Sequence, residues 1–186
     1  VLFRSLSRQK PRPLHQHCRL QKAKQNAAPE AVPAALHSVA VQHAALGVLC
    51  DAVRLLNASL LVQVDGIGQA LVDGCLAALT GSKAAPLVKQ VGAHLAGLLG
   101  QYSGPAFRDF CLQASWPLLE RLATKSNARA PSQLNVTENA VSSLCRIADA
   151  YPQDVNLDQL LNVILPAALP VLMDEDEVEP VAVFLM

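Results

Sequence analysis

The residues best suited to binding a metal ion lie near the start of the chain. His15, His17 and Cys18 are three potential ligands within four positions. A closed zinc site needs about four ligands in tetrahedral geometry, and no matching cluster occurs elsewhere in the sequence. We therefore expect no metal site and interpret these side chains as part of a basic N-terminal segment.

Residue patterns for catalysis or for cofactor binding are weak. The run from Asp65 to Gly68 has two glycines of a dinucleotide-binding loop, but it lacks the third and lies within a helical pattern. We interpret these glycines as small residues where two helices pack closely. His94 and Cys111 could act in nucleophilic catalysis only if held together, and the sequence has no elbow motif and no strands to present a nucleophile. We expect no enzyme and no cofactor.

The densest group of ionisable side chains is acidic and runs from Asp174 to Glu179. Two roles suit it, and both can hold. Carboxylates at a helix N-terminus interact favourably with the helix macrodipole, so Asp174 to Glu177 predicts a capping box that opens a final helix. On a concave surface, the same carboxylates would attract Lys- and Arg-rich segments of a partner protein.

Charge is divided unequally along the 186 residues. The 15 Lys and Arg balance the 15 Asp and Glu, but residues 1–24 hold seven basic side chains and no acidic one. We predict that residues 1–31 form a disordered basic leader. Organelle targeting and binding of nucleic acid are the alternatives, but Pro11 and Pro13 interrupt an amphipathic helix and no aromatic residues alternate with the basic ones. We expect no direct binding of nucleic acid.

Residues 32–186 have the pattern of successive amphipathic helices. The hydrophobic fraction is 52% and the aromatic fraction 4%, which favours helices over strands. Apolar residues recur at helical spacing within 60–79, 88–99, 107–122, 141–148, 157–172 and 181–185. Breaks are expected at Thr80–Ser82, Tyr102–Gly104 and Tyr151–Pro152, and Asn135 to Glu138 predicts a further capping box. The apolar stretch Gln159–Met173 is too short to cross a bilayer, so we expect no membrane insertion.

The helices also suggest a repeat. First helices are expected near residues 58, 105 and 157 and their partners near 85, 137 and 175, with steps of roughly 40 to 50 residues. This spacing predicts an all-α, HEAT-type α-solenoid of about three antiparallel helix pairs over residues 32–186. Pro117 and Pro166 are expected to bend the first helices. The apolar ending Phe184–Met186 leads us to expect a piece of a longer solenoid, truncated at its C-terminus.

Cysteine usage indicates a reducing compartment. The five cysteines are odd in number and widely spaced, and four of them lie on apolar helical faces, where cysteine behaves as a small hydrophobic residue. These four are Cys50, Cys75, Cys111 and Cys145.

Several runs between Gln101 and Pro170 resemble one family of proteins. They are Gln101-Tyr102-Ser103-Gly104, Phe107-Arg108-Asp109-Phe110-Cys111, Pro117-Leu118-Leu119, Asn135-Val136-Thr137-Glu138-Asn139-Ala140, Val155-Asn156-Leu157-Asp158-Gln159-Leu160-Leu161 and Leu169-Pro170. In content and order they look like the C-terminal half of an importin-β (karyopherin-β) superfamily nuclear transport receptor of the karyopherin beta-3 type. A looser likeness reaches back to about Leu46.

The resemblance implies a segment of a nuclear import receptor that acts at the nuclear pore and moves between cytoplasm and nucleus. Such receptors bind protein cargo and nucleoporins and are regulated by Ran-GTP, here mainly through repeats outside this chain. The family also has a polar ladder between repeats, in which Asp174 would take the turn position and Lys89 would replace an arginine. The alternative is a HEAT or armadillo scaffold without a transport role, of the phosphatase regulatory or cytoskeletal adaptor type.

Repeat geometry places the candidate partner-binding residues on the second helices of the pairs. They are Lys89, Glu138, Asn139, Arg146, Glu175 and Glu177. We expect these side chains to contribute to a surface that binds basic cargo.

Overall fold

The computed structural model describes residues 38–56, 63 and 66–186, which all belong to one compact unit, Ala35–Met186. Every regular element in these residues is a helix, so the predicted all-α fold class is confirmed for the described part. The predicted leader, the boundary after residue 31 and the His15–Cys18 cluster lie outside the described residues.

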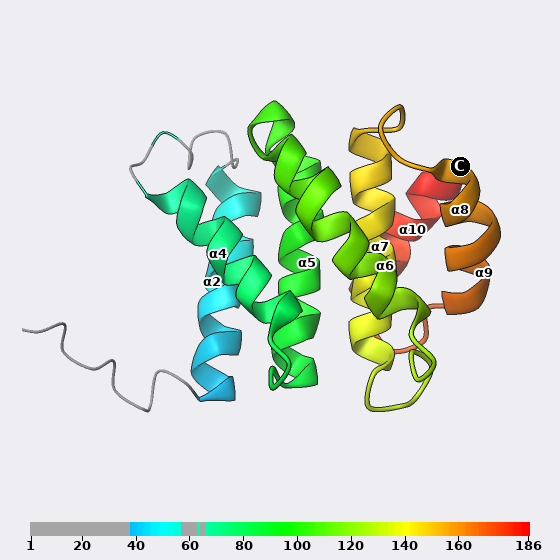
Figure 1. The fold of residues 1–186 in the computed structure, drawn as a ribbon, viewed down its shortest axis with the longest axis horizontal. Helices are drawn as coiled ribbons and strands as arrows, with labels where there is room; N and C mark the ends of the chain where they lie inside the picture. Colours follow the sequence, from blue (N-terminus) through cyan, green and yellow to red (C-terminus); the bar gives the residue numbers. More distant parts are fainter. Residues whose placement is uncertain (1–37, 57–62, 64–65) are drawn as a thin grey trace, which may run out of the picture. The chain divides into compact units, whose positions relative to one another are not determined.

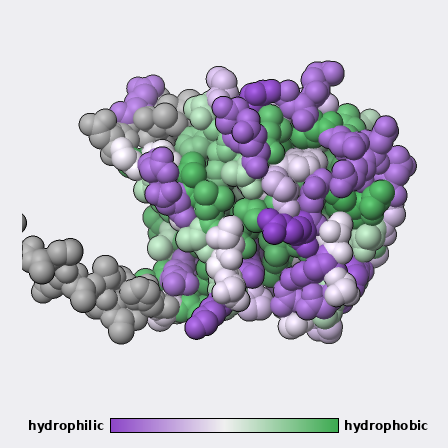
Figure 2. Space-filling model, viewed as in Figure 1, coloured by the Kyte–Doolittle hydropathy of each residue, from purple (hydrophilic) through white to green (hydrophobic). Residues whose placement is uncertain are grey.

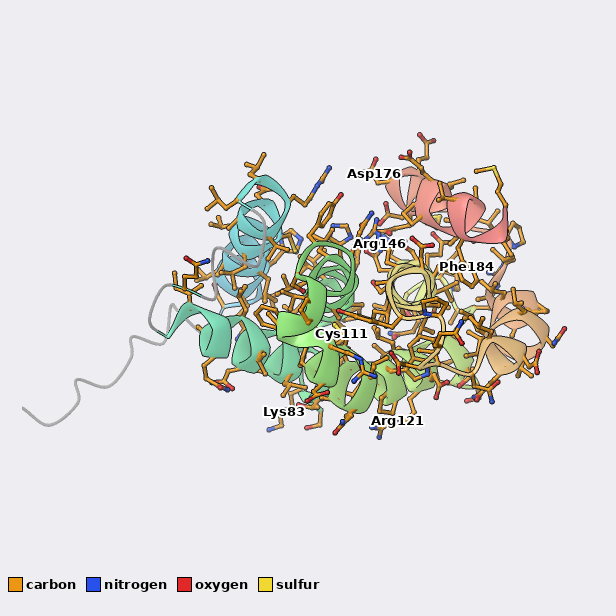
Figure 3. All side chains as sticks on the ribbon, turned by 90° about the horizontal axis from the view of Figure 1, so that it is seen from above. Lys83, Cys111, Arg121, Arg146, Asp176 and Phe184 are labelled. Carbon is orange, nitrogen blue, oxygen red and sulfur yellow. The ribbon has the colours of Figure 1, made fainter. Side chains whose placement is uncertain are left out.

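Consecutive helices alternate between two layers (Figure 1). One layer contains α2 (Val39–Leu56), α5 (Pro86–Tyr102), α7 (Leu134–Ala150) and α10 (Val178–Leu185), each packed on the next. The other contains α4 (Ile67–Thr80), α6 (Trp116–Thr124), α8 (Leu157–Gln159) and α9 (Leu165–Ala168). Figure 3, which views the layers end-on, shows that the buried apolar side chains lie between them.

Two stretches of the second layer depart from α-helical geometry in the same way. The π-helical segments η3 (Phe110–Ser115) and η4 (Leu160–Ile164) each lead directly into an α-helix whose second residue is proline. Proline cannot donate a backbone hydrogen bond, and a π turn is one way for a helix to absorb the disturbed pattern. The helix is therefore altered close to the predicted positions, Pro117 and Pro166. In the 3-10 segment η2 (Gly104–Phe107), Pro105 occupies the first turn, where its missing N–H group needs no partner within the helix.

Helix α5 packs closely against its neighbours because it carries glycine at the contacts. A Cβ atom on Gly92 would lie 2.6 Å from the Cβ of Ala78 in α4, and one on Gly97 would lie 2.8 Å from the Cα of Ser143 in α7. The Ser143 hydroxyl donates a hydrogen bond to the carbonyl of Ala93 at 2.7 Å, across the same contact. The sequence pattern did not single out these two glycines.

The interpretation of the Asp65–Gly68 run is wrong in part. Gly66 precedes α4, which begins at Ile67, and it has a φ of 80°, in the left-handed region that favours glycine. A Cβ atom on Gly66 would meet no atom of the described residues within 4 Å, so close packing does not account for this glycine there, whereas its backbone conformation does. The predicted helix start near residue 58 falls in 57–62, outside the described residues.

Both predicted capping boxes are wrong. Helix α7 begins at Leu134, before Asn135, and its N-terminal residue has no side-chain cap. The carboxylate of Glu138 bonds to a distant loop instead of its own helix start. The turn before α10 is a 3-10 segment, η5 (Glu175–Glu177), and Asp174 does not cap it through its side chain.

By length and composition alone, α2 is long and apolar enough to cross a membrane. One of its faces, with Leu46, Cys50 and Val53, is buried against the protein. Its other side includes apolar residues open to solvent, such as Val48 and Leu55. The expectation that the chain does not insert into a membrane stays a prediction.

The four described cysteines are unpaired and buried, as the sequence predicted: Cys50, Cys75, Cys111 and Cys145. Burial raises the pKa of the thiols of Cys50, Cys111 and Cys145 to about 12. It also raises the pKa of the Cys75 thiol, which is completely buried. The thiol of Cys75 donates to the carbonyl of Gly92 at 3.3 Å.

We expect these thiols to be unreactive in the native protein, because the thiolate is the reactive form and burial suppresses it. In a Cys18→Ser variant, dithionitrobenzoate at pH 8 should react very slowly in buffer and rapidly in urea, as followed by absorbance. Fast reaction of any thiol in buffer would contradict the packing described above.

Candidate partner-binding groove

A groove with a volume of about 580 Å³ is lined by residues of α2, α5, α7 and α10 and of the turn before α10. Its position follows from the fold, because these four helices form one layer and α10 lies farther from α6 than α7 does (Figure 3). The opposite face of the molecule, formed by α4, α6 and α9, mixes polar and apolar residues (Figure 2).

The groove is strongly acidic. Its lining includes six carboxylates, from Asp149, Asp174, Glu175, Asp176, Glu177 and Glu179, and two guanidinium groups, from Arg54 and Arg146. Glu175, Asp176 and Glu179 are exposed, and Figure 3 shows Asp176 on the side of the α10 layer that faces away from α6. Charge of this kind attracts cationic segments.

One of these carboxylates, that of Glu177, is buried at the centre of a polar network. Its Oε1 lies 2.6 Å from Nδ1 of His94 on α5, and its Oε2 accepts a hydrogen bond from the Ser142 hydroxyl on α7. The guanidinium of Arg146 lies 3.2 Å from the same Oε2. Burial favours a higher pKa for Glu177, but the hydrogen bond from His94 and the charge of Arg146 outweigh it and lower the pKa.

The geometry assigns a proton to Nδ1 of His94 and leaves Nε of Arg146 without a hydrogen-bond partner among the described residues. Because Glu177 is ionised, Nδ1 of His94 must be the donor in their hydrogen bond. Nη1 of Arg146 lies 3.2 Å from that same nitrogen and therefore cannot donate to it. Nε of Arg146 is buried and has no partner among the described residues. The Arg146 side chain is only 9% exposed, and among the described residues its one ion pair is with Glu177.

Glu138 holds the loop that leads into the acidic turn. Its side chain is buried, and its Oε1 accepts the backbone N–H of Leu172 at 2.7 Å. Its Oε2 accepts the N–H groups of Met173 and Asp174, both at 3.0 Å. One carboxylate on α7 thus fixes three successive backbone groups.

Asp174 links two helices of the layer. Its Oδ2 accepts hydrogen bonds from Asn139 on α7 at 2.8 Å and from Gln90 on α5 at 3.2 Å. The family resemblance placed Lys89 at this ladder position, and that expectation is wrong, because the contact is made by Gln90. Lys89 lies outside the groove lining and close to Lys125, whose pKa is lowered by burial and by the charge of Lys89.

Besides Lys89 and Arg146, which are described above, the predicted partner-binding residues fall into two groups. Glu175 is exposed and lines the groove. Glu138, Asn139 and Glu177 are at most 2% exposed and bond within the chain. A partner would reach these three only if the network opened, and a binding role for the six residues stays a prediction.

Three members of the network were not predicted from the sequence. Gln90 and Ser142 were not considered, and His94 was considered only for catalysis. The signal was the spacing of four between Gln90 and His94 and between Ser142 and Arg146, which puts each pair on one helix face. Among the described residues, no cluster of His, Cys, Asp and Glu could hold a metal ion.

The resemblance to the importin-β superfamily rests on short runs between Gln101 and Pro170. No family model matches the chain. No solved structure matches it either.

Proposed function

We propose that this chain is part of a HEAT-type helical array that binds a Lys- and Arg-rich segment of a partner protein in the groove. The observation that carries the proposal is the groove lining, in which six carboxylates face two guanidinium groups. A cationic segment would be attracted to this surface and would find the exposed carboxylates of Glu175, Asp176 and Glu179 available for ion pairs.

The alternation of helices between two layers supports the HEAT-type assignment. Three successive pairs would be α4 with α5, η3 and α6 with α7, and α8 to α9 with α10. The second and third pairs share the π turn followed by proline in their first helix. Similar units that stack on their neighbours are what a solenoid of about three helix pairs requires.

The resemblance extends the proposal to nuclear import. Under this hypothesis, the segment is a C-terminal scaffold of an import receptor for basic cargo, and Ran-GTP acts through other repeats. The alternative is a HEAT or armadillo scaffold without a transport role. Immobilised Ran loaded with GTP should retain the cellular gene product, and Ran loaded with GDP should not. Equal retention or none would favour the alternative.

Charge reversal in the groove should weaken binding of a basic peptide. We expect the Glu175→Lys, Asp176→Lys double variant to bind a fluorescent Lys- and Arg-rich peptide with about tenfold higher Kd, since an exposed ion pair contributes up to about 1 kcal/mol. Fluorescence anisotropy at low and high salt would measure this, and the salt dependence of Kd should also decrease.

A matched control carries the same change of charge outside the groove. Asp73 and Asp158 are exposed and do not line the groove, so the Asp73→Lys, Asp158→Lys variant should retain most of its affinity. An equal loss of affinity in both variants would show that net charge alone governs binding and would overturn the assignment of the groove.

A further inference from the structure

Helix α10 has few buried residues, and the polar contacts that attach it are made by the turn before it. Val181 is its one fully buried residue, whereas Val178, Val183 and Leu185 are about half exposed. By contrast, α7 buries most of its length between α5 and α6. The apolar contribution to the attachment of α10 is therefore small.

The polar contacts converge on the turn before α10, residues 172–177. The side chains that make them come from α5 and α7 and are Gln90, His94, Glu138, Asn139, Ser142 and Arg146. Within the turn they bind the Asp174 and Glu177 carboxylates and three backbone N–H groups. A helix attached in this way can detach at a lower cost than the unfolding of α5 and α7, whose contacts are apolar and extensive.

We propose that α10 and its preceding turn form a latch, which closes one side of the groove and opens, while α5 and α7 stay folded, when the Glu177 carboxylate loses its charge. Residues of this latch supply much of the groove lining, from Asp174 to Phe184. Opening the latch would remove the acidic wall of the groove. The latch does not depend on the identity of a partner, so it goes beyond the proposed function.

The direction of the pH effect follows from the groups around Glu177. Those lining the same groove are His43 and Arg54 on α2, His94 on α5, Arg146 and Asp149 on α7, and Asp174, Glu175, Asp176 and Glu179 on its own segment. Because the network lowers the pKa of Glu177 below its ordinary value of 4.5, the stabilisation is complete above that pH and is lost as pH falls below it. Protonation also removes the ion pair with Arg146, while neutral carboxylates nearby no longer repel one another.

Hydrogen exchange of the 186-residue chain, followed by mass spectrometry, tests the latch. After correction for intrinsic rates, we expect peptides covering 174–186 to be less protected than those covering α5 at pH 6. Between pH 6 and pH 4 the protection of α10 should fall by up to about fourfold more than that of α5, because at pH 4 a carboxyl with the ordinary pKa of 4.5 is mostly protonated once the latch is open. Parallel loss of protection in α10 and α5 would overturn the proposal without any variant.

A pair of variants then identifies the group responsible. In Glu177→Gln, the α10 peptides should already have low protection at pH 6 and change less on acidification. Glu179→Gln removes an exposed carboxylate from the same helix and should behave as the original chain does. Loss of α10 protection in both variants, or in neither, would show that Glu177 does not hold the latch. Peptide affinity is not used in this readout, so failure of the latch and failure of the proposed function are distinguishable.

Discussion

Replacement of Gly97 by alanine should destabilise the chain by about 1 to 3 kcal/mol, the usual cost of overpacking a tight contact. The new methyl carbon would lie 2.5 Å from Oγ, 2.8 Å from Cα and 2.8 Å from Cβ of Ser143. A main-chain carbon cannot rotate away as the end of a side chain can, so α5 and α7 must separate. Separation would also stretch the hydrogen bond from Ser143 to the carbonyl of Ala93. These losses exceed the advantage of alanine in a helix, about 1 kcal/mol.

The matched control is Gly47→Ala in α2. A Cβ atom at Gly47 meets nothing within 4 Å, so the same substitution there should stabilise the chain by about 0.5 to 1 kcal/mol through helix propensity alone. Urea denaturation followed by circular dichroism would compare the two variants. Equal stabilisation of both would mean that α5 and α7 are not in close contact at Gly97.

Helix ends could be predicted because their signals are local. The breaks expected at Thr80–Ser82, Tyr102–Gly104 and Tyr151–Pro152 agree with helices that end at Thr80, Tyr102 and Ala150. In each case a small, polar or proline residue follows within a few positions and disfavours continuation of the helix. The apolar positions between these breaks form the core, since helical spacing puts them on one face.

The partners of the acidic residues could not be predicted from local pattern. Asp174 and Glu138 each match a capping box, yet each bonds to residues far away in sequence. Asp174 accepts from Gln90, 84 positions earlier, and Glu138 accepts from Leu172, 34 positions later. A carboxylate can satisfy either a local or a distant N–H group, and the choice depends on how the helices pack. The close contact at Gly97 could not be predicted from local pattern either, because it depends on where α7 crosses α5.

Replacement of Glu138 by glutamine should also be costly, on the order of 2 to 4 kcal/mol, because a hydrogen bond to a charged group contributes about 1.5 to 3 kcal/mol. The amide keeps one acceptor oxygen for three N–H groups. Its nitrogen would oppose either the N–H of Leu172 or those of Met173 and Asp174. Two donors in contact repel each other, so the loop before α10 would lose at least one of its attachments.

Glu175→Gln provides the comparison, since Glu175 is exposed and the same change there should alter the free energy of unfolding by less than about 0.5 kcal/mol. Urea denaturation of both variants at pH 7 measures the difference. Similar small effects would show that water replaces Glu138 at the loop without loss. A large effect of Glu138→Gln alone would establish that this buried carboxylate organises the turn from which the acidic wall of the groove is built, because it binds the N–H group of Asp174 and those of the two residues before it.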